Sequence, residues 1–365
     1  MSRYVLMEAI LLVGGKGTRL RPLTINTPKP MLPVAGVPFT EHQIARARDA
    51  GVTRIVLGTS YKAEVFNRYF GDGSRLGVEL VYLTEDEPLG TGGGIRHAAS
   101  GLESGPNDPV LVFNGDILSG ADLEEIVARH TDTDAAVTLH LTKVDDPRAF
   151  GLVPTDSTDR VTDFLEKPTT EAEIVTDQIN AGCYVFRRSV IDEIPPNRVV
   201  SVERETFPSL LERGERLTGV VDSSYWLDLG TPLAFVQGSR DLVSGVVTSG
   251  AVPSHAGDTL VSANASIDTS AVISDGSAIG ANVEVAEDAQ IVGSVLMDGV
   301  RVKAGAVVRD SVVASGAVIG DDARLDGAVV AENAQIGADV ELATGARVWP
   351  DAVLSPGSIR FSSDK

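Results

Sequence analysis

The segment "AILLVGGKGTRLRPLTINTPKPMLP", residues 9–33, runs from an apolar stretch into glycines, then into basic residues, then into prolines. No Asp or Glu occurs from residue 9 to residue 40, although the chain has a formal net charge of -20. The basic residues of this span are Lys16, Arg19, Arg21 and Lys29. A glycine-rich turn after a strand commonly binds phosphate, because bare backbone N–H groups can approach an anion closely. The segment therefore predicts a buried first strand with an anion-binding loop at its end.

Two familiar phosphate-binding patterns do not fit this loop. The GxGxxG pattern would need a glycine where Leu20 stands, and the GxxxxGK[ST] pattern has no match here. A plain surface turn is the alternative interpretation. The basic side chains argue against it, because the Arg fork matches phosphate oxygens and Lys adds a compact positive charge.

Composition excludes several classes of protein. The 51 acidic residues against 31 basic ones argue against a nucleic-acid partner or an anionic membrane surface. The single cysteine, Cys183, rules out an intrachain disulfide and Cys-based zinc clusters, and we expect a buried free thiol in a strand. The first apolar run is too short for a membrane span and lacks a signal-peptide cleavage pattern. We therefore expect a cytoplasmic protein without membrane partners.

The first 240 residues alternate between short apolar stretches and helical patterns. The predicted strands are residues 9–13, 54–60, 78–85, 109–116 and 134–144, and the predicted helices are residues 40–50, 63–71 and 121–130. This alternation is typical of an α/β fold with a mostly parallel sheet and helices on both faces. Residues 241–260 are rich in Gly, Ser, Val and Pro without a clear period, and are interpreted as a linker.

After the linker, aliphatic residues recur every six positions, with some spacings of five. They are Ile267, Ile273, Ile279, Val285, Ile291, Leu296, Val302, Val308, Val313, Ile319, Leu325, Val330, Ile336, Leu342, Val348 and Leu354. Small residues often stand two positions earlier, as at Ala289 and Ala306. One inward aliphatic per side at this spacing indicates a triangular parallel β-helix over residues 261–365.

Five further motifs follow the first loop in order along the chain. They are "PLGTGGG" (88–94), a second glycine-rich loop, "VFNGD" (112–116), "FLEKP" (164–168), "INAGCYVF" (179–186) and "WLDLGTP" (226–232). Each motif alone is a weak signal, since an Asp at a strand end is often a cap. With all of these motifs in this order, the chain closely resembles the sugar-nucleotide pyrophosphorylases. Within that family it most resembles the mannose-1-phosphate guanylyltransferases. The resemblance spans almost the whole chain, with one departure, "GTGGG" where many relatives read GTAG. Gly for Ala there is expected to loosen the loop.

The resemblance implies a Rossmann-like nucleotidyltransferase domain over residues 1–240 and a left-handed β-helix of hexapeptide repeats over residues 261–365. It also implies a reaction, in which GTP and mannose 1-phosphate give GDP-mannose and pyrophosphate. Negative charge must then be neutralised on both sides of the α-phosphorus. No general base is needed because the attacking oxygen is already anionic, which agrees with the absence of His from these motifs.

The resemblance also assigns roles to individual residues. Expected nucleotide contacts are Leu12, Gly14, Gly15, Gly17, Thr18, Arg19, Lys29, Glu85, Gly90 and Thr91. Expected sugar-phosphate contacts are Gly151, Glu166, Lys167 and Asn180, and expected Mg²⁺ ligands are Asp116 and Asp228. Arg19, Lys29, Lys167 and Asp116 are the expected catalytic residues. Trp226 is expected to pack beside the sugar pocket.

Glu85 is the candidate for recognising the base. A carboxylate offers only acceptors, and guanine presents two adjacent donors, N1–H and the N2 amino group. The alternative is that Glu85 is a solvated strand-end acid and that Glu87 or backbone groups contact the base.

Two rival functions and one open question remain at this stage. A non-catalytic regulatory homologue would have lost the phosphate and metal positions, which are all present here. A β-helix that transfers acyl groups would need a histidine base, and residues 261–365 contain none. A glucose-1-phosphate nucleotidyltransferase using UTP, dTTP or ATP stays open, because mannose and glucose differ at one hydroxyl. The β-helix is expected to form homo-oligomer contacts.

Overall fold

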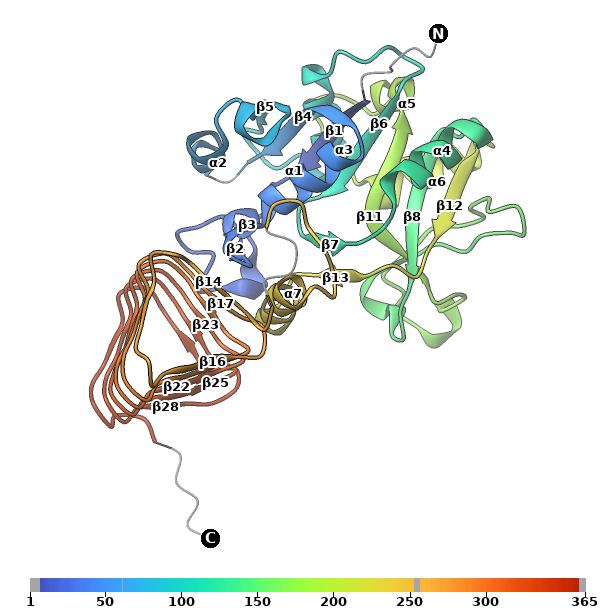
Figure 1. The fold of residues 1–365 in the computed structure, drawn as a ribbon. Helices are drawn as coiled ribbons and strands as arrows, with labels where there is room; N and C mark the ends of the chain where they lie inside the picture. Colours follow the sequence, from blue (N-terminus) through green and yellow to red (C-terminus); the bar gives the residue numbers. More distant parts are fainter. Residues whose placement is uncertain (1–6, 61, 253–256, 361–365) are drawn as a thin grey trace. The chain divides into compact units, whose positions relative to one another are not determined.

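The computed structural model describes residues 7–60, 62–252 and 257–360 (Figure 1). The remaining parts of the predicted domains and linker (residues 1–6, 61, 253–256 and 361–365) lie outside the described residues. The chain divides into two compact units, the first made of residues 1–15 and 43–226 and the second of residues 16–42 and 227–365. The predicted domain boundaries at residues 240 and 261 stay a prediction, and the two units are described separately.

The first unit contains a nine-stranded sheet with a parallel centre. Its main path runs β10-β9-β11-β6-β1-β4-β5, and β8 and β12 continue it from β11. The parallel strands on this path are β1 (Met7–Leu12), β4 (Val52–Thr59), β5 (Glu79–Thr84) and β6 (Pro109–Asn114). Antiparallel to β6 lies β11 (Gln178–Arg187), which also pairs with β8 (Val137–Lys143) and β9 (Gly151–Leu152), while β12 (Leu217–Val221) and β10 (Leu165–Glu166) complete the sheet. The predicted mostly parallel α/β sheet is confirmed.

The order of the central strands determines where a ligand can bind. From β1 the chain continues to β4 and β5 on one side, and then returns to β6 on the other side of β1. Such a change of direction opens a crevice outside the carboxyl ends of the two strands, where ligands of open α/β sheets bind. The glycine loop follows β1 and the "NGD" turn follows β6, so both predicted motifs lie at this switch point.

Helices connect the strands of this sheet. They are α1 (Phe39–Asp49), α2 (Ala63–Phe70), α3 (Gly90–Ala98), α4 (Leu123–Thr133), α5 (Arg188–Asp192), the π-helix η7 (Val202–Thr206) and α6 (Phe207–Glu212). The helix α4 begins where the Asp122 carboxylate accepts the backbone N–H groups of Glu124 and Glu125, a capping contact that satisfies two otherwise unpaired donors. The second glycine-rich motif was predicted as a loop, and this is wrong, because Gly90 begins α3. None of the helices in the described ranges has the length and hydropathy needed to cross a membrane.

The second unit contains three parallel sheets stacked as the sides of a triangular coil (Figure 1). Their strands are two or three residues long, from β14 (Thr259–Val261) to β30 (Val353–Leu354), and each strand pairs with the one a full coil later. The predicted aliphatic positions from Ile279 to Val348 form its buried core, which confirms the β-helix. The arrangement is consistent with the left-handed type that the repeat predicts.

Polar ladders support the turns of the β-helix. Ser277, Ser294 and Ser311 are buried and lie one coil apart, and the hydroxyl of each accepts a backbone N–H from the following coil. Many corner residues are Asp, Asn or Gly with a positive φ, among them Asp322 (56°) and Asn333 (57°). These residue types tolerate the left-handed conformation, so the corners can be tight.

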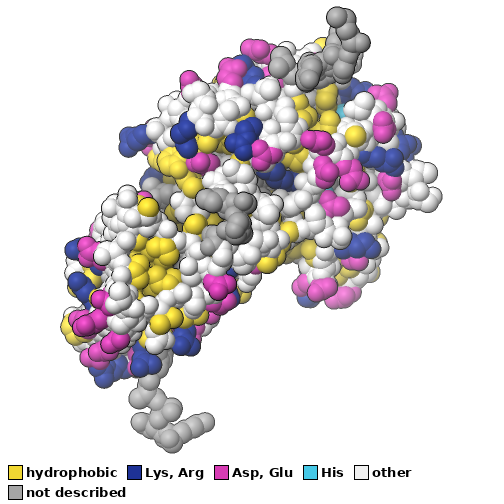
Figure 2. Space-filling view, viewed as in Figure 1, with side chains coloured by type: hydrophobic (Ala, Val, Ile, Leu, Met, Phe, Trp, Pro, Cys, Tyr) yellow, Lys and Arg dark blue, Asp and Glu magenta, His cyan; other side chains and the backbone are white. Residues whose placement is uncertain are grey.

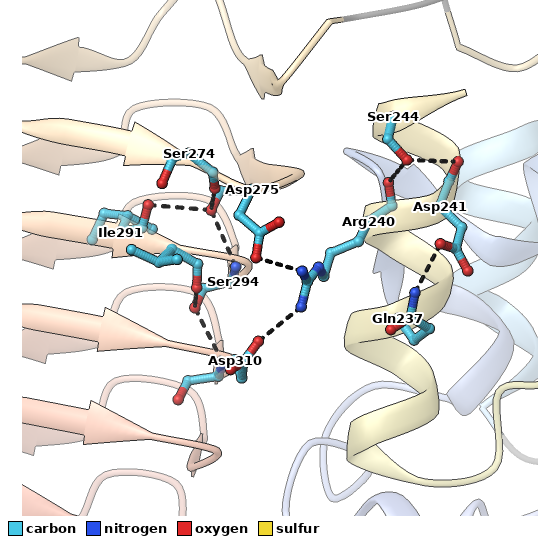
Figure 3. A network of polar contacts seen from close by, with 12 residues as sticks. Gln237, Arg240, Asp241, Ser244, Ser274, Asp275, Ile291, Ser294 and Asp310 are labelled. Carbon is cyan, nitrogen blue, oxygen red and sulfur yellow. Dashed lines mark hydrogen bonds and ion pairs between the residues drawn. The ribbon is translucent and has the colours of Figure 1, made fainter. Parts of the chain in front are cut away.

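The helix α7 (Pro232–Ser244) belongs to the same unit and packs against the β-helix. Figure 3 shows Arg240 of α7 reaching Asp275 and Asp310, which follow β16 (Val272–Ser274) and β22 (Val307–Arg309) and lie two coils apart. The helix ends at Ser244 and β14 begins at Thr259, so the first four residues of the predicted linker, 241–244, are helical.

Candidate functional site

The loop after β1 is exposed and has little freedom at its start. The N–H of Val13 donates to the carbonyl of Gly58, which fixes the end of the strand. Gly15 has φ 105°, in a region that L side chains rarely adopt, and no atom lies within 4 Å of a Cβ built there. Gly15 therefore presents open backbone at the carboxyl end of β1, as an anion-binding loop requires, while a Cβ at Gly14 would lie 2.9 Å from Ser60 Oγ.

Asp116 lies at the same edge because of the glycine before it. The N–H of Gly115 donates to the carbonyl of Leu12 at 2.9 Å. A Cβ at Gly115 would lie 2.3 Å from that carbonyl oxygen, so a glycine is required for this close approach. The structure thus brings Asp116 beside the glycine loop, and half-buried Leu12 links the two segments.

The helix α3 begins with a run of glycines that pack against the segment before η7. The N–H groups of Gly92 and Gly93 donate to the carbonyl of Val200, and a Cβ at Gly90 would lie 2.6 Å from the same oxygen. A Cβ at Gly92 would lie 2.9 Å from the Val200 side chain. Glycine at position 92 therefore avoids a clash with Val200. The departure from GTAG predicted only that glycine would loosen the loop.

Glu85 follows β5 and faces the start of α3. One carboxylate oxygen, Oε2, accepts the N–H of Leu89 at 3.1 Å. The other, Oε1, would lie 2.7 Å from a Cβ built at Gly94. The carboxylate is therefore oriented by the protein, and Gly94, the last residue of the "PLGTGGG" motif, leaves the room that the carboxylate needs.

Thr91 makes protein contacts through its side chain. Its hydroxyl donates to the Glu203 carboxylate at 2.7 Å and accepts the N–H of Val202 at 2.9 Å. Glu203 also accepts the hydroxyl of Ser201 at 2.7 Å. The hydroxyl of Thr91 thus connects α3 to η7, which leaves its backbone for the predicted nucleotide contact. No sequence spacing relates Thr91 to Glu203, 112 residues away.

The predicted sugar-binding residues form one row across three strands. Glu166 of β10 lies opposite Gly151 of β9, and the pairing of Ile179 with Leu152 places Asn180 of β11 beside Gly151. A Cβ at Gly151 would lie 2.7 Å from the Glu166 carboxylate. Strands separated by long stretches of sequence thus bring these residues together on one sheet.

Two local distortions adjoin this row. Lys167 has a left-handed backbone, φ 54°, and its Nζ lies 3.6 Å from Glu166 Oε1 with 61% of the side chain exposed. In β11 the register shifts between Asn180 and Tyr184, where Gly182 has φ 75°. Such bulges often re-aim side chains next to active sites.

The bulge is supported by buried polar contacts. Asn180 donates to the hydroxyl of Tyr184 at 2.7 Å and accepts the N–H of Gly182. Burial raises the pKa of Tyr184 well above its usual range, so its hydroxyl stays protonated. The Trp226 indole donates to the carbonyl of Ala181 at 3.0 Å and its ring meets Phe150 edge-on, a packing role as predicted.

Cys183 lies in β11 and is buried as a free thiol, as predicted. Burial raises the pKa of this thiol to about 11. The thiol is therefore protonated at neutral pH and not activated for nucleophilic chemistry.

Within the second unit, the carboxylate of Asp228 lies between two predicted phosphate-binding cations. Arg19 Nη2 donates to Asp228 Oδ2 at 3.3 Å, and Lys29 Nζ lies 3.7 Å from Oδ1. Gly230 allows this approach, because a Cβ there would lie 2.4 Å from the Arg19 guanidinium. Gly17, with φ 54°, packs on Lys29, and a Cβ at Gly17 would lie 2.8 Å from the Cβ of Lys29.

The two predicted metal ligands have oxygen chemistry that fits a hard divalent cation. Asp228 Oδ1 is buried and accepts no hydrogen bond among the described residues, and Lys29 Nζ, 3.7 Å away, is its ion-pair partner. Within the described ranges, no three His, Cys, Asp or Glu side chains cluster to hold a metal by themselves.

Comparison with known proteins agrees with this geometry. Residues 8–245 match the family model for nucleotidyl transferase, and residues 255–359 match that for the GMPPB C-terminal domain. A mannose-1-phosphate guanylyltransferase of Mycobacterium tuberculosis (strain ATCC 25618 / H37Rv) is 55% identical over 359 residues, 98% of each chain. Mannose-1-phosphate guanylyltransferase 1 of Arabidopsis thaliana is 34% identical over 84% of this chain and 86% of its own length.

A solved structure gives the same result for the fold. The crystal structure of HddC from Yersinia pseudotuberculosis aligns with a TM-score of 0.55 and 27% identity, over 64% of this chain and 99% of that one. A second structure of HddC, complexed with GMP-PN, aligns with a TM-score of 0.54. With these matches and the site geometry together, the chain belongs to the nucleotidyl transferase family and is a nucleotidyltransferase enzyme with a GMPPB-type C-terminal domain.

Proposed function

We propose that this enzyme transfers the guanylyl group of GTP to mannose 1-phosphate, releasing pyrophosphate and forming GDP-mannose. The observation that carries the proposal is the 55% identity, over 98% of both chains, to a protein named mannose-1-phosphate guanylyltransferase. The contacts around Glu85, the row at Gly151 and the cations beside Asp228 support it. These three features match the needs of the base, the sugar and the phosphates.

In the proposed reaction an oxygen of mannose 1-phosphate attacks the α-phosphorus in line with the departing pyrophosphate. Arg19 and Lys29 neutralise charge on the triphosphate and on pyrophosphate, and Lys167 binds the sugar phosphate. Arg19 is 63% exposed in its pair with Asp228, so it can move to a phosphate at little cost, because exposed ion pairs contribute little free energy. Glu166 and Asn180 contact the sugar hydroxyls beside Gly151, where a side chain would fill the space.

Enzymes of this family generally use a divalent metal ion, and we propose Mg²⁺ bound by Asp116 and Asp228. A bound divalent ion would neutralise charge on phosphoryl oxygens while the bond to the leaving group breaks. Asp228 Oδ1, which accepts no hydrogen bond among the described residues, supports this choice of ligand. Gly115 supports it as well, because it keeps Asp116 beside the glycine loop.

The proposal includes the partners of the protein. GTP, mannose 1-phosphate, GDP-mannose and pyrophosphate are the small-molecule partners. On the face shown in Figure 2, acidic side chains are interspersed with basic ones, and the described residues there form no continuous basic surface for nucleic acid. A homo-oligomer formed through the β-helix is supported by apolar side chains on its surface, with Val272, Trp349 and Val353 exposed by 52%, 52% and 66%.

The test is a pyrophosphate-release assay that crosses GTP, UTP, dTTP and ATP with mannose 1-phosphate and glucose 1-phosphate. The proposal expects the highest kcat/KM for GTP with mannose 1-phosphate. Asp116→Asn is the matched negative control, since it keeps the side-chain shape and removes the charge that binds the metal. A preference for glucose 1-phosphate with UTP, dTTP or ATP would replace the proposal by its alternative. Near wild-type turnover of Asp116→Asn with Mg²⁺ would remove Asp116 from the metal site.

A further inference from the structure

Two side chains of the β-helix contact the basic loop that carries Arg19 and Lys29. Glu332, after strand β26 (Val329–Val330), accepts the Asn26 amide N–H and the Thr27 hydroxyl through separate oxygens, each at 2.9 Å. Arg347, at the start of β29 (Arg347–Val348), donates to the backbone carbonyl of Arg19 at 3.0 Å and also to that of Arg21. All these residues belong to the second unit.

The place of Arg347 in the β-helix shows why it points at the loop. Successive residues of a strand face opposite sides, so the partners of the core row form an outward row of Ala278, Val295, Val312, Val329 and Arg347. The three outward valines are at most 3% exposed. These valines are therefore buried although they face away from the core of the β-helix. In the last coil an arginine takes the place of these valines, and it binds the loop.

The last coil also departs from the repeat just before Arg347. The corner from Val308 to Val313 and the corner from Leu325 to Val330 each span five residues, whereas the corner from Leu342 to Val348 spans six. The extra residue lies in the turn that contains Gly345, with φ 88°. The first coil shares this longer spacing, between Ile273 and Ile279, so the β-helix core tolerates it.

The contacts bracket the segment that separates the two cations. Arg347 binds the backbone at residues 19 and 21, and Glu332 binds the side chains of residues 26 and 27, two positions before Lys29. Inside the loop, the Thr24 hydroxyl donates to the carbonyl of Gly17 at 2.9 Å. The backbone between Arg19 and Lys29 is thus restrained at both ends from outside and once from within.

We propose that Glu332 and Arg347, here called the loop clamp, are positioning residues for the phosphate-binding cations. The clamp holds the loop so that Arg19 and Lys29 present a fixed pair of charges to the triphosphate and to pyrophosphate. A fixed arrangement favours binding because the loop does not have to be ordered when the ligand arrives. This inference rests on the proposed function and assigns to the β-helix a role in nucleotide binding besides stabilisation.

The experiment compares clamp variants with matched β-helix variants in the full chain. Glu332→Ala and Arg347→Met remove the clamp, and Arg347→Lys retains a donor. Glu284→Ala and Arg324→Met are the controls, since both residues are exposed on the two other sheets, in β18 (Glu284–Val285) and β25 (Arg324–Asp326). The readouts are KM for each substrate, kcat, the midpoint of thermal unfolding, and calorimetric Kd for inorganic pyrophosphate.

The clamp predicts a selective effect on the phosphate side. Each clamp variant should raise KM for GTP and Kd for pyrophosphate by about three- to tenfold, because exposed hydrogen bonds to charged groups contribute modestly. KM for mannose 1-phosphate should stay within about twofold, since its proposed contacts belong to the first unit. Arg347→Lys should recover part of the loss. The triple variant Glu332→Ala, Asn26→Ala, Thr27→Ala should raise KM for GTP and Kd for pyrophosphate no more than Glu332→Ala does alone. All three substitutions remove the same contact.

Three results would overturn the inference. Clamp variants that match the two controls in KM and Kd would show that the contacts have no effect on binding. Equal changes in KM for both substrates with a lowered unfolding midpoint would indicate a stabilising role alone. Loss of pyrophosphate affinity in the controls as well would make the effect general to the β-helix. Failure of the proposed function gives a different result, since the wild-type protein would then not release pyrophosphate from GTP with mannose 1-phosphate. The Kd for pyrophosphate of the wild-type and clamp variants would still test the clamp in that case.

Discussion

Lys167 combines an exposed charge with an unfavourable backbone conformation. Its φ of 54° lies in the left-handed region, which costs a non-glycine residue about 1–2 kcal/mol. The hydrogen bond from its N–H to the carbonyl of Phe150, at 3.0 Å, holds this conformation. Strained residues of this kind concentrate at binding sites, which supports the proposed role of Lys167 toward the sugar phosphate.

We predict that two substitutions at Lys167 distinguish the effect of its charge on substrate binding from the effect of its backbone strain on stability. Lys167→Ala and Lys167→Gly should both raise KM for mannose 1-phosphate by roughly tenfold or more, because a charge-assisted contact is lost. Lys167→Gly should be about 1 kcal/mol more stable than Lys167→Ala, since glycine adopts positive φ without steric cost. Steady-state kinetics and urea unfolding measure the two effects. An unchanged KM in both variants would remove Lys167 from the sugar-phosphate site.

Glu85→Gln tests how the base is recognised. Gln retains one acceptor and adds a donor, which opposes the N–H groups of guanine, so kcat/KM for GTP should fall by roughly tenfold or more. The values for UTP and dTTP should change much less. Gly94→Ala should give a similar but smaller shift, because its Cβ would lie 2.7 Å from Glu85 Oε1. If the preference for GTP survives Glu85→Gln unchanged, another group recognises the base.

At the scale of elements, α3 depends on its contact with the segment before η7. Three consecutive glycines weaken a helix by roughly 1 kcal/mol each relative to Ala. The helix forms here because close packing on the backbone of residues 198–200 compensates for the low helix propensity of the glycines. A pattern-based interpretation cannot include this contact, and for that reason it predicted a loop.

Gly93→Ala should therefore destabilise the protein even though alanine favours helices. Its Cβ would lie 2.5 Å from the carbonyl oxygen of Arg198 and 2.8 Å from Leu89 Cβ, and overpacking of this kind costs about 1–3 kcal/mol. Gly120→Ala is the control, since the nearest atom to its Cβ is 3.6 Å away. Urea unfolding compares the two variants. Equal stability of both would show that the backbone of residues 198–200 moves aside without cost.

The contact between α4 and β8 makes stability depend on pH. His130 of α4 is buried against Thr138 of β8, with 3.0 Å between Nδ1 and Oγ1. Burial, aided by the Arg187 charge, lowers the pKa of His130 from 6.5 to about 4. Below pH 6.5 the histidine is protonated in the unfolded chain but stays neutral in the native state. The free energy of unfolding therefore falls by up to about 3 kcal/mol between pH 6.5 and 4.

Comparison with a variant isolates this contribution. His130→Gln removes the titrating group, so its deficit in unfolding free energy relative to wild type should shrink by about 1.4 kcal/mol per pH unit below 6.5. Urea unfolding at pH 7.5, 6.5, 5.5 and 4.5 measures the difference. A deficit that stays constant with pH would mean that the pKa of His130 is the same in the native and unfolded states.

At the scale of the whole molecule, the β-helix shares its unit with residues 16–42 and α7. Within that unit, the N–H of Ala35 donates to the Ser239 hydroxyl of α7 at 3.1 Å, and Arg240 of α7 binds two coils of the β-helix (Figure 3). The loop with the phosphate-binding cations is therefore packed with the C-terminal part of the chain. Its hydrogen-bond partners include a residue more than 300 positions away, Glu332.

A chain ending at residue 245 should accordingly lose more than an oligomer contact. Removal of the β-helix exposes the apolar surfaces that it covers in its own unit, and removes Glu332 and Arg347. We expect at least a tenfold loss of kcat/KM for GTP, a lower unfolding midpoint and a changed oligomeric state, with light scattering as the measure of the last. A truncated chain that stayed equally active, stable and oligomeric would contradict the role proposed for the β-helix.

Local patterns predicted much of the fold and the composition of the site. Hexad spacing identified the inward residue of each β-helix strand from Ile279 to Val348, since each side of a coil buries one aliphatic side chain. The run before Gly14 identified the first strand for a similar reason. Wherever neighbours in sequence are also neighbours in the fold, periodicity is sufficient evidence.

The sequence by itself determined the first strand, the β-helix, the family motifs and therefore the class of reaction. Only the tertiary structure decided which groups meet across long separations: Thr91 with Glu203, Glu166 with Gly151 and Asn180, and Glu332 with the loop at residues 26 and 27. It also decided that the "GTGGG" segment is helical. These outcomes depend on distant segments that come so close that a Cβ built at Gly90, Gly93 or Gly151 would lie 2.5–2.7 Å from the neighbouring segment. A linear sequence records residue types without recording which distant residues come into contact.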